Sequence, residues 1–465
     1  MYITDVTIID LKCFRGTHSF SLQHADGSFA GWTVFAGRNG SGKTTLLKAI
    51  ALALVGPVRG NALAGTFPDW VSTKRERGET RIALSVDEAR DLWNGETEKL
   101  FSAAVGPLAY ANGGVAIGPY RAFPDNWVGS GVYWTKRNSE PDGFYFTIPF
   151  DEKTPEKSAF FGPWATPPAG WFAAGYGAQR RVGPAAEDVR RLSESPLMAR
   201  LIHLFHESAT LNDAVKWLQG VHLRALEKKN GAADLKEAVL RVLDDGLLPD
   251  GSRVVRVDSD GLWVERDGVL LPLEQISDGY RTVTALVADI LRHLHTCYGE
   301  LPIEDSPGGH TVCNLPGVVL IDEVDAHLHV SWQQRIGFWL TSRFPRLQFL
   351  VTTHSPFICQ AASPGGIIRL PAPGEESRIG PVSGDAWTAI VRGGADDAVM
   401  TELFGLEHPH SDETEALLHR LARLEVSVLR GTASPNEVAE YTMLRDKLPS
   451  DIGSRAAQVR RALDP

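Results

Sequence analysis

The sequence predicts an α/β fold on two main observations. A glycine-rich loop at residues 37–44 lies between an apolar stretch with the character of a buried strand and a stretch with the character of a helix. Far downstream, the apolar and β-branched run 317–321 ends in two acids, as a central parallel strand does where it delivers carboxylates at its C-terminal edge. We therefore expect a mixed N-terminal sheet, a central and mostly parallel sheet flanked by helices, a helical lobe and a C-terminal helical hairpin.

The loop at 37–44 has the sequence Gly-Arg-Asn-Gly-Ser-Gly-Lys-Thr, which is typical of a phosphate-binding loop. Its glycines let the backbone turn with the amides aimed inward, and the helix N-terminus adds partial positive charge where phosphate oxygens sit. Lys43 is expected to reach the β and γ phosphates of a nucleotide, and the Thr44 hydroxyl to complete the shell of a magnesium ion. The residues expected at the phosphates are Gly37, Asn39, Gly40, Ser41, Gly42, Lys43, Thr44 and Thr45.

Composition indicates an ordinary globular protein. The chain has 465 residues, 43% hydrophobic and 22% charged, and a prior of about 150 residues per domain predicts two to four structural units. The formal net charge of -10 argues against a surface that binds nucleic acid throughout, so DNA contact must rest on local clusters. The cysteines lie far apart, without zinc spacing or a disulfide pattern, and no signal peptide or spanning apolar run is evident. We expect a cytoplasmic protein without a membrane segment.

Strands and turns are expected in the first part of the chain. Alternating apolar residues over 2–9 and 18–22, with a turn at 13–16, predict two strands, and 80–86 predicts another. The stretch 100–170 is crowded with glycine, proline and aromatic residues. Short strands and loops that pack a small satellite core explain this composition better than a dedicated ligand surface does.

Helical spacing returns after Pro184 and predicts three helices, followed by a hairpin at 253–264. Residues 332–344 predict a helix and 347–353 an apolar strand, after which we expect a loop region. Two antiparallel helices should end the chain, the first capped by Ser411 and the second by a capping box at 434–437. The expected divisions are an N-terminal lobe at 1–95, an insertion at 96–170, a helical lobe at 171–250, a C-terminal lobe at 251–392 and a helical C-terminal region at 393–465.

The acid pair and a downstream histidine complete a site for nucleotide hydrolysis. Asp322 is expected to hold the magnesium ion, and Glu323 to position and polarise the attacking water. His354, at the tip of the next strand, is expected to donate to the γ phosphate. Alone, the acids are explained as well by a solvated strand end and the histidine by a surface residue, but their order and spacing favour the catalytic interpretation.

With these motifs the chain resembles the ABC-type ATPase heads of the SMC and RecF group, over roughly residues 1–90 and 260–360. The resemblance implies that the nucleotide is ATP, that Mg²⁺ is the cofactor and that ATP is hydrolysed. It also implies that Ser277 and Gly279 form a signature that caps the γ phosphate bound by the opposite subunit. Tyr280 stands where Gln or Glu is more usual, which leaves the contact after the glycine open.

Three more residues take roles from this resemblance. Asp325 matches the acid of the D-loop, and Gln179 matches the glutamine between the two lobes, which would join Thr44 and Asp322 at the metal. Arg15 lies in a turn that looks like the Phe-Arg turn of RecF-like proteins and is expected as a nucleotide contact. Two chains would dimerise head to tail, with ATP held between the loop of one and the signature of the other.

Three functions are compatible with such an ATPase. A transporter ATPase needs a membrane partner, and the Phe-Arg turn argues against it. A RecF/SMC-like DNA repair or DNA-binding ATPase needs a groove of cations. The candidates, which a solvated helix face would also explain, are Arg180, Arg181, Arg190, Arg191, Arg224, Lys228 and Lys229.

The third and favoured function is anti-phage defence. The short head without a coiled-coil arm, the stretches 175–181 and 277–281 and the terminal helical pair resemble the ATPase subunit (PtuA-like) of Septu and retron-associated systems. That resemblance implies a dimer or higher homo-oligomer that regulates a separately encoded effector nuclease, often of the HNH type. This chain shows no nuclease motif, since His408 and His410 lack companion ligands. The terminal helices are expected to contact the effector or a second copy, with packing onto their own head as the alternative.

Overall fold

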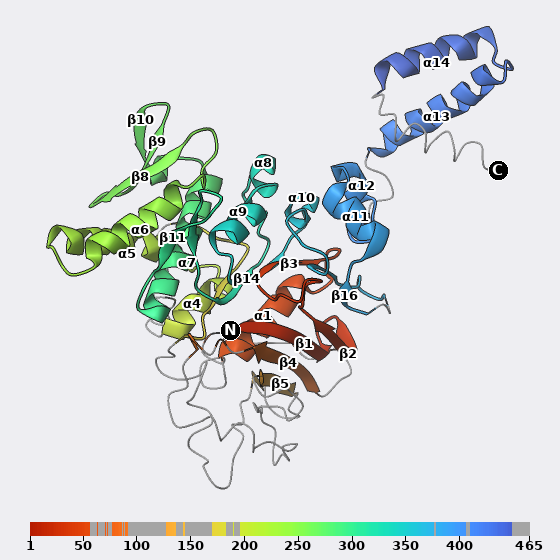
Figure 1. Cartoon of the computed structure of the whole chain (residues 1–465). Helices are drawn as coiled ribbons and strands as arrows, with labels where there is room; N and C mark the ends of the chain where they lie inside the picture. The colour runs from red at the N-terminus through yellow and green to blue at the C-terminus, as the bar shows by residue number, and fades with distance from the viewer. Residues whose placement is uncertain are drawn as a thin grey trace. The chain divides into compact units, whose positions relative to one another are not determined.

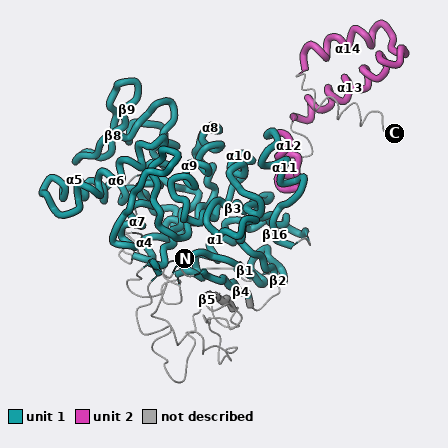
Figure 2. The backbone as a smooth tube through the Cα atoms, in the orientation of Figure 1, with its two compact units in different colours: residues 1–395 teal, residues 396–465 magenta. Residues whose placement is uncertain are grey.

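The computed structural model describes a large part of the chain, in two compact units that comprise residues 1–395 and 396–465 (Figure 2). The residues it describes are 1–55, 63, 70, 72, 77–85, 87, 89–91, 127–135, 143–144, 170–182, 189, 196–375, 378–405 and 410–448. Most of the predicted insertion at 96–170, and with it the expected satellite core, lies outside these residues, as do Arg190, Arg191 and His408. None of the helices in the described parts combines the length and apolar character needed to cross a membrane.

The N-terminal sheet has the strand order β2-β1-β4-β5-β6. Its strands are β1 (Tyr2–Leu11), β2 (Phe14–Ser21), β4 (Arg77–Ser85), β5 (Trp127–Thr135) and β6 (Gly143–Phe144). Each described pairing is antiparallel, whereas we had expected a mixed sheet. The reason is local for β1 and β2, because only a tight turn connects them and parallel strands need a crossover. The part of the insertion that forms β5 extends this sheet beside β4.

The central sheet has the order β16-β15-β3-β14-β13-β7. Its first five strands in the chain run parallel, and only the short β16 runs antiparallel, which confirms the predicted mostly parallel sheet. Because parallel strands end at one edge, the segments that follow them meet there. The strands are β3 (Gly31–Ala36), β7 (Ala173–Tyr176), β13 (Gly317–Ile321), β14 (Leu347–Thr352), β15 (Ile367–Arg369) and β16 (Gly380–Pro381).

Helix α1 (Lys43–Val55) lies in the core between the two sheets (Figure 1). Its sequence is apolar on nearly all sides, which is the pattern of a helix buried all round. The sheets are also joined by the buried amide of Gln348 on β14. Its oxygen accepts the Ile3 N–H at 2.7 Å, and its nitrogen donates to the Ile3 carbonyl at 2.7 Å. The α/β fold predicted from the sequence is therefore confirmed.

The predicted helices after Pro184 are present as α4 (Pro196–Phe205), α5 (Asn212–Leu226) and α6 (Ala232–Asp244). Helix α4 packs on β7, where Leu201 and Leu204 lie against Gly175. Helices α5 and α6 pack on each other and on the long helix α7 (Asp278–Tyr298). The predicted hairpin also forms beside them, as β8 (Arg253–Asp258) and β9 (Gly261–Arg266), with β10 (Val269–Pro272) added (Figure 1).

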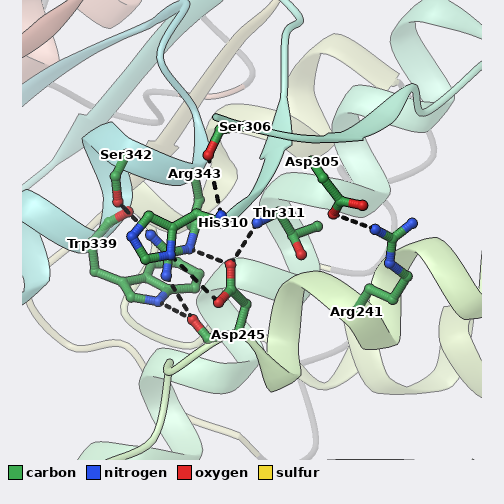
Figure 3. Close-up of polar contacts among 9 residues, drawn as sticks. All are labelled: Arg241, Asp245, Asp305, Ser306, His310, Thr311, Trp339, Ser342 and Arg343. Carbon is green, nitrogen blue, oxygen red and sulfur yellow. Dashed lines mark hydrogen bonds and ion pairs between the residues drawn. The ribbon is translucent and has the colours of Figure 1, made fainter. Parts of the chain in front are cut away.

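One acid, Asp245, connects the end of α6 to a short strand and a helix later in the chain. It follows α6, and its carboxylate accepts the Thr311 N–H from β12 (Thr311–Cys313) at 2.7 Å. The same carboxylate forms an ion pair with Arg343 of α9 (Ile336–Arg343), whose Nε lies 2.8 Å away (Figure 3). Its backbone carbonyl accepts Trp339 Nε1 at 2.8 Å and Arg343 Nη2 at 3.0 Å. Strand β12 pairs with β11 (Ile303–Asp305), and α9 packs on β3.

Two expectations for the second half of the chain are wrong in detail. The single helix expected at 332–344 is divided into α8 (Val330–Gln333) and α9, with an i to i+3 turn at Arg335 between them. The loop region expected after His354 contains α10 (Pro356–Cys359), β15, β16 and α11 (Gly384–Arg392). Elements this short leave little periodic signal in a sequence.

The second unit contains the predicted helical hairpin. Helix α13 (Asp412–Leu429) is capped by the Ser411 hydroxyl, which accepts the Thr414 N–H, and α14 (Pro435–Lys447) begins with the predicted capping box. Leu421, Leu424 and Leu444 form its buried cluster. The short helix α12 (Ala395–Val399) precedes the hairpin in the chain.

A buried polar cluster connects α7 to β7. The Tyr176 hydroxyl donates to Asp289 Oδ2 at 3.0 Å, and Arg292 Nη2 lies 2.7 Å from Asp289 Oδ1. His293 Nε2 lies 3.2 Å from the same carboxylate. Burial raises the Asp289 pKa, but His293 and Arg292 outweigh burial and hold it far below its usual value. Burial lowers the pKa of His293 to about 4, although the nearby Asp289 carboxylate acts to raise it.

The lowered pKa of His293 predicts a loss of stability in mild acid. Between pH 6.5 and 4, His293 is protonated in the unfolded state but neutral in the folded state. Its contribution to the free energy of unfolding is therefore fully present above pH 6.5 and decreases as the pH falls. The slope from this group approaches about 1.4 kcal/mol per pH unit. We expect His293→Gln to flatten the decrease of the melting temperature between pH 6.5 and 4.5. An unchanged slope in the variant would assign the acid sensitivity to other groups.

Candidate nucleotide-binding site

The predicted phosphate loop lies between β3 and α1, at the carboxyl edge of the central sheet. Gly40 and Gly42 have φ angles of 79° and 89°, which side chains rarely adopt. A Cβ atom on Gly42 would stand 2.6 Å from Cys13 Sγ and 2.6 Å from the Phe14 ring. The loop conformation therefore requires glycine, and the turn at 13–16 packs directly on it.

Lys43 and Ser41 have polar groups in the loop that could bind a phosphate. The buried Lys43 ammonium donates to the carbonyls of Gly37 at 2.8 Å and Arg38 at 3.2 Å. Burial lowers the Lys43 pKa, and the nearby carboxylates of Asp322, Glu323 and Asp325 oppose this effect. The buried Ser41 hydroxyl has no hydrogen-bond partner within the described residues. An orphaned hydroxyl and a lysine held only by loop carbonyls fit a site for phosphate.

Asp322 stands at the centre of the site. Its Oδ2 accepts the Thr44 hydroxyl at 2.8 Å, and its Oδ1 accepts the Thr352 hydroxyl at 2.6 Å. Its backbone N–H donates to the Tyr176 carbonyl on β7 at 2.8 Å. A carboxylate and a hydroxyl side by side supply hard oxygen ligands, so Asp322 and Thr44 fit a Mg²⁺ ion shared with nucleotide phosphates.

Glu323 is half-buried and has a φ angle of 45°. Its N–H donates to the Thr352 hydroxyl at 2.7 Å, so Thr352 holds both acids of the pair. Arg180 donates to the backbone carbonyls of both acids and is only 6% exposed. Arg180 was a candidate cation for the alternative DNA-binding function, with a solvated helix face as the other explanation. The structure contradicts both, because the guanidinium is buried against backbone carbonyls.

The segment after β14 is hydrogen-bonded to Asp325, the predicted D-loop acid. The Thr353 hydroxyl donates to Asp325 Oδ1 and accepts the Ser355 N–H at 2.9 Å. The Ser355 hydroxyl donates to Gln333 Oε1 at 2.7 Å. Between these two anchored residues, His354 is exposed at the end of the strand, where a ligand on the sheet edge can meet it.

The predicted signature residues lie at the start of α7. Ser277 is the N-cap, yet its exposed hydroxyl makes no capping hydrogen bond. Gly279 packs so closely on the D-loop that a Cβ atom there would stand 2.4 Å from the His327 carbonyl oxygen. The predicted signature and the predicted D-loop segment are therefore side by side in one chain. In the described residues, the Ser277 side chain makes no hydrogen bond to the phosphate loop of its own chain.

The other predicted site residues have less defined surroundings. Gln179 is exposed in the segment after β7, next to the buried Arg180. Arg15 is exposed on β2, directly after the Phe14 ring that packs against Gly42. Thr45 lies in the first turn of α1, while Asn39 is exposed in the loop. Sequence reasoning missed Thr352, although a threonine two positions before His354, at the end of a mostly apolar strand, was a usable signal.

Parts of the chain are similar to known protein families and proteins. A family model described as "AAA domain, putative AbiEii toxin, Type IV TA system" matches residues 173–360, and one described as "AAA domain" matches residues 5–99. The chain is 34% identical over 171 residues to the Retron Ec83 probable ATPase of Escherichia coli, which covers 36% of this chain and 30% of that protein. It is 40% identical over 84 residues to the Septu protein PtuA of Bacillus mycoides (strain KBAB4), which covers 18% of this chain and 10% of that protein.

These matches confirm the predicted resemblance to ATPases of retron and Septu systems and the prediction of an ATPase domain. The chain spans less than a third of the length of both relatives. A solved SMC head bound to the C-winged helix domain of ScpA is 16% identical, with 82% of this chain and 98% of that chain covered at a TM-score of 0.44. That likeness is too distant to support an argument.

The tight contact at Gly42 predicts a specific sensitivity to substitution. Gly42→Ala should weaken ADP binding at least tenfold and lower the melting temperature, because the new Cβ displaces Cys13 or Phe14. Gly231→Ala is the matched control, since Gly231 also has a positive φ of 72° but no atom within 4 Å of a new Cβ. Calorimetric titration with ADP and thermal melts check both variants. Equal losses of ADP affinity would show that strain alone, and not this contact, matters.

Proposed function

We propose that this chain binds and hydrolyses ATP with Mg²⁺ at sites shared between two copies, and that this cycle regulates a separately encoded effector in anti-phage defence. The geometry around Asp322 supports the ATPase reaction most strongly. The Asp322 carboxylate accepts hydrogen bonds from the hydroxyls of Thr44 on α1 and Thr352 on β14, and the buried Lys43 lies nearby. Phosphoryl transfer depends on such positioning and on charge stabilisation rather than on covalent chemistry.

Each central residue has a task in this reaction. Lys43 neutralises charge on the β and γ phosphates, and Thr44 and Asp322 hold the metal. Mg²⁺, when bound, supplies Lewis-acid polarisation of the phosphate oxygens. Glu323 orients the attacking water and polarises it, and His354 donates a hydrogen bond to the γ phosphate.

Two peripheral residues have weaker support. Gln179 directly precedes Arg180, which contacts the acid pair, so a role at the metal is compatible with its position. Arg15 is one residue from the Phe14 ring at the phosphate loop, which favours a nucleotide contact. Both remain predictions from the resemblance.

The second half of each ATP site is proposed to come from another copy of the chain. The Ser277 hydroxyl is exposed and unused as a cap, as a group must be if its ligand arrives from outside. Because Gly279 packs on the carbonyl of His327, the signature and the D-loop of Asp325 can face a partner together. Head-to-tail pairing then forms two equivalent sites from one pair of surfaces.

Mixing two inactive variants tests the shared site. Lys43→Ala disables the loop and Ser277→Arg disables the signature, so each homodimer should lack ATP turnover. A mixed dimer regains one intact site, formed by the loop of the Ser277→Arg chain and the signature of the Lys43→Ala chain. At equal concentrations we expect about a quarter of the wild-type turnover, because half the dimers are mixed and each has one working site.

The matched control is a mixture in which a single chain has both substitutions. Mixing Lys43→Ala,Ser277→Arg with Lys43→Ala leaves no working loop and should show no recovery. If the first mixture stays inactive while both chains still form dimers by light scattering, ATP is bound and hydrolysed within one chain and the shared site is wrong.

The proposed effector is a nuclease, of HNH type, encoded next to this chain. The similarity to proteins named retron ATPase and Septu PtuA supports a defence role. The alternative, a RecF/SMC-like DNA-binding ATPase, has less support, because Arg180 is buried in the ATP site. Arg224, Lys228 and Lys229 remain exposed and keep DNA contact as a hypothesis. The cytoplasm remains the predicted location.

The C-terminal hairpin is proposed to bind the effector. Truncation after Gly405 removes α13 and α14, a unit with its own apolar cluster, so ATP turnover should persist while co-purification with the neighbouring gene product is lost. Leu429→Ser tests the same surface with one change, because Leu429 is 76% exposed on α13.

Val269→Ser is the control for Leu429→Ser, as Val269 is 55% exposed but lies on β10 of the first unit. Co-purification should survive in this control. Retention of the effector by the truncated chain would place the contact elsewhere. ATP turnover that rises with DNA and ignores the effector would favour the DNA-binding alternative.

A further inference from the structure

Arg180 makes a set of contacts that its exposed neighbours do not. Its Nη1 donates to the carbonyls of Gly177 at 2.8 Å and Asp322 at 2.6 Å, and its Nη2 donates to the carbonyls of Glu323 at 2.9 Å and Val324 at 3.4 Å. One guanidinium thus joins the segment after β7 to three consecutive carbonyls after β13. A planar fork of donors suits such a row of acceptors.

The backbone held in this way is strained. Glu323 has a φ of 45°, a region that costs a non-glycine residue of the order of 1–3 kcal/mol unless its surroundings hold it there. On one side the Glu323 N–H is bound by the Thr352 hydroxyl. On the other side its carbonyl accepts Arg180 Nη2 and the Ala326 N–H. The direction of the Glu323 side chain depends on these contacts, because φ decides where Cβ points.

Arg180 keeps its charge in this buried position. Burial lowers its pKa to about 10, and the carboxylates of Asp322, Asp325 and Glu323 oppose that effect. The group is therefore protonated at neutral pH. Within the described part of the chain, its hydrogen bonds go to carbonyl oxygens, and it forms neither an ion pair with a carboxylate nor a hydrogen bond to the phosphate loop. A purely electrostatic role does not require a fork that spans four carbonyls.

We propose that Arg180 is a positioning residue for hydrolysis, which holds the strained backbone of Glu323 so that its carboxylate meets the attacking water. This inference rests on the proposed function, in which Glu323 polarises that water. Arg180 acts through Glu323 and does not touch the nucleotide. Its loss should therefore slow the chemical step and leave nucleotide binding by Lys43 and the loop in place, since misplacement of a reacting group by about 1 Å can cost roughly a hundredfold in rate.

Arg180→Lys is the main test. Lysine keeps the charge but replaces the planar fork with one ammonium on a flexible stem, so it cannot hold all four carbonyls in the same geometry. We expect kcat for ATP hydrolysis to fall about tenfold or more, while the Kd for ADP changes less than about threefold. Arg180→Gln, which keeps two donors without the charge, is the second variant and should behave in the same way if the lysine variant does not fold.

Two matched controls separate position from stability. Arg181→Lys makes the same change on the exposed neighbour and should leave kcat unchanged. Arg343→Lys makes it on an equally buried arginine, 6% exposed, that binds Asp245 in the contact drawn in Figure 3. It should lower the melting temperature and leave kcat unchanged. A fall of kcat in proportion to melting temperature across all three variants would overturn the proposal.

A double variant tests whether Arg180 acts through Glu323. In the Glu323→Gln background the carboxylate is gone, so adding Arg180→Lys should cost no further residual turnover. Multiplied losses in the double variant would overturn the proposal. Absence of ATP turnover in the wild type, or full turnover in Glu323→Gln, would overturn the proposed function instead. Wild-type kcat in Arg180→Lys would overturn only this inference.

Discussion

The carboxylate of Asp322 is the point on which the rest of the site depends. It joins the first turn of α1 through Thr44 to β14 through Thr352, while its own backbone joins β7 through Tyr176. Hydrogen bonds to a charged group contribute about 1.5–3 kcal/mol each. The phosphate loop is thereby connected to three strands of the central sheet. A shift of any one of them must change the position of Asp322.

Charge balance explains why acids can gather so closely here. Asp322, Glu323 and Asp325 lie within electrostatic reach of both Lys43 and Arg180. Three carboxylates in a partly buried site would repel one another without these cations. Lys43 lies on the side of the phosphate loop, and Arg180 lies on the side of the backbone carbonyls. In the proposed function, a bound nucleotide contacts Lys43, whereas Arg180 stays on the backbone carbonyls.

Sequence reasoning could assign expected roles to residues that local spacing defines. The phosphate loop, Asp322, Glu323 and the strand before His354 are of this kind, because neighbours in the chain define them. It missed the contacts of Thr352 and grouped Arg180 with candidate cations for DNA, because the contacts of both residues depend on strand order. Only the order β7-β13-β14 brings them to the acid pair. The sequence also did not predict that α8 and α9 are separate helices, because the apolar spacing continues across the break between them. Strand β16 was not predicted because two residues are too few to show a pattern.

The contact of Gly279 with His327 links the two halves of the proposed ATP cycle within one chain. Gly279 belongs to the signature that would face the partner's nucleotide, and the D-loop of His327 contains Asp325, which accepts the Thr353 hydroxyl beside His354. His354 would face the chain's own nucleotide. The His327 carbonyl oxygen lies so close to Gly279 that a Cβ atom there would be only 2.4 Å away. The two segments can therefore move little relative to each other, because close-packed contacts transmit displacement. Loss of phosphate at one site should therefore displace the groups that hold the other, so the two sites of a dimer are expected to open together.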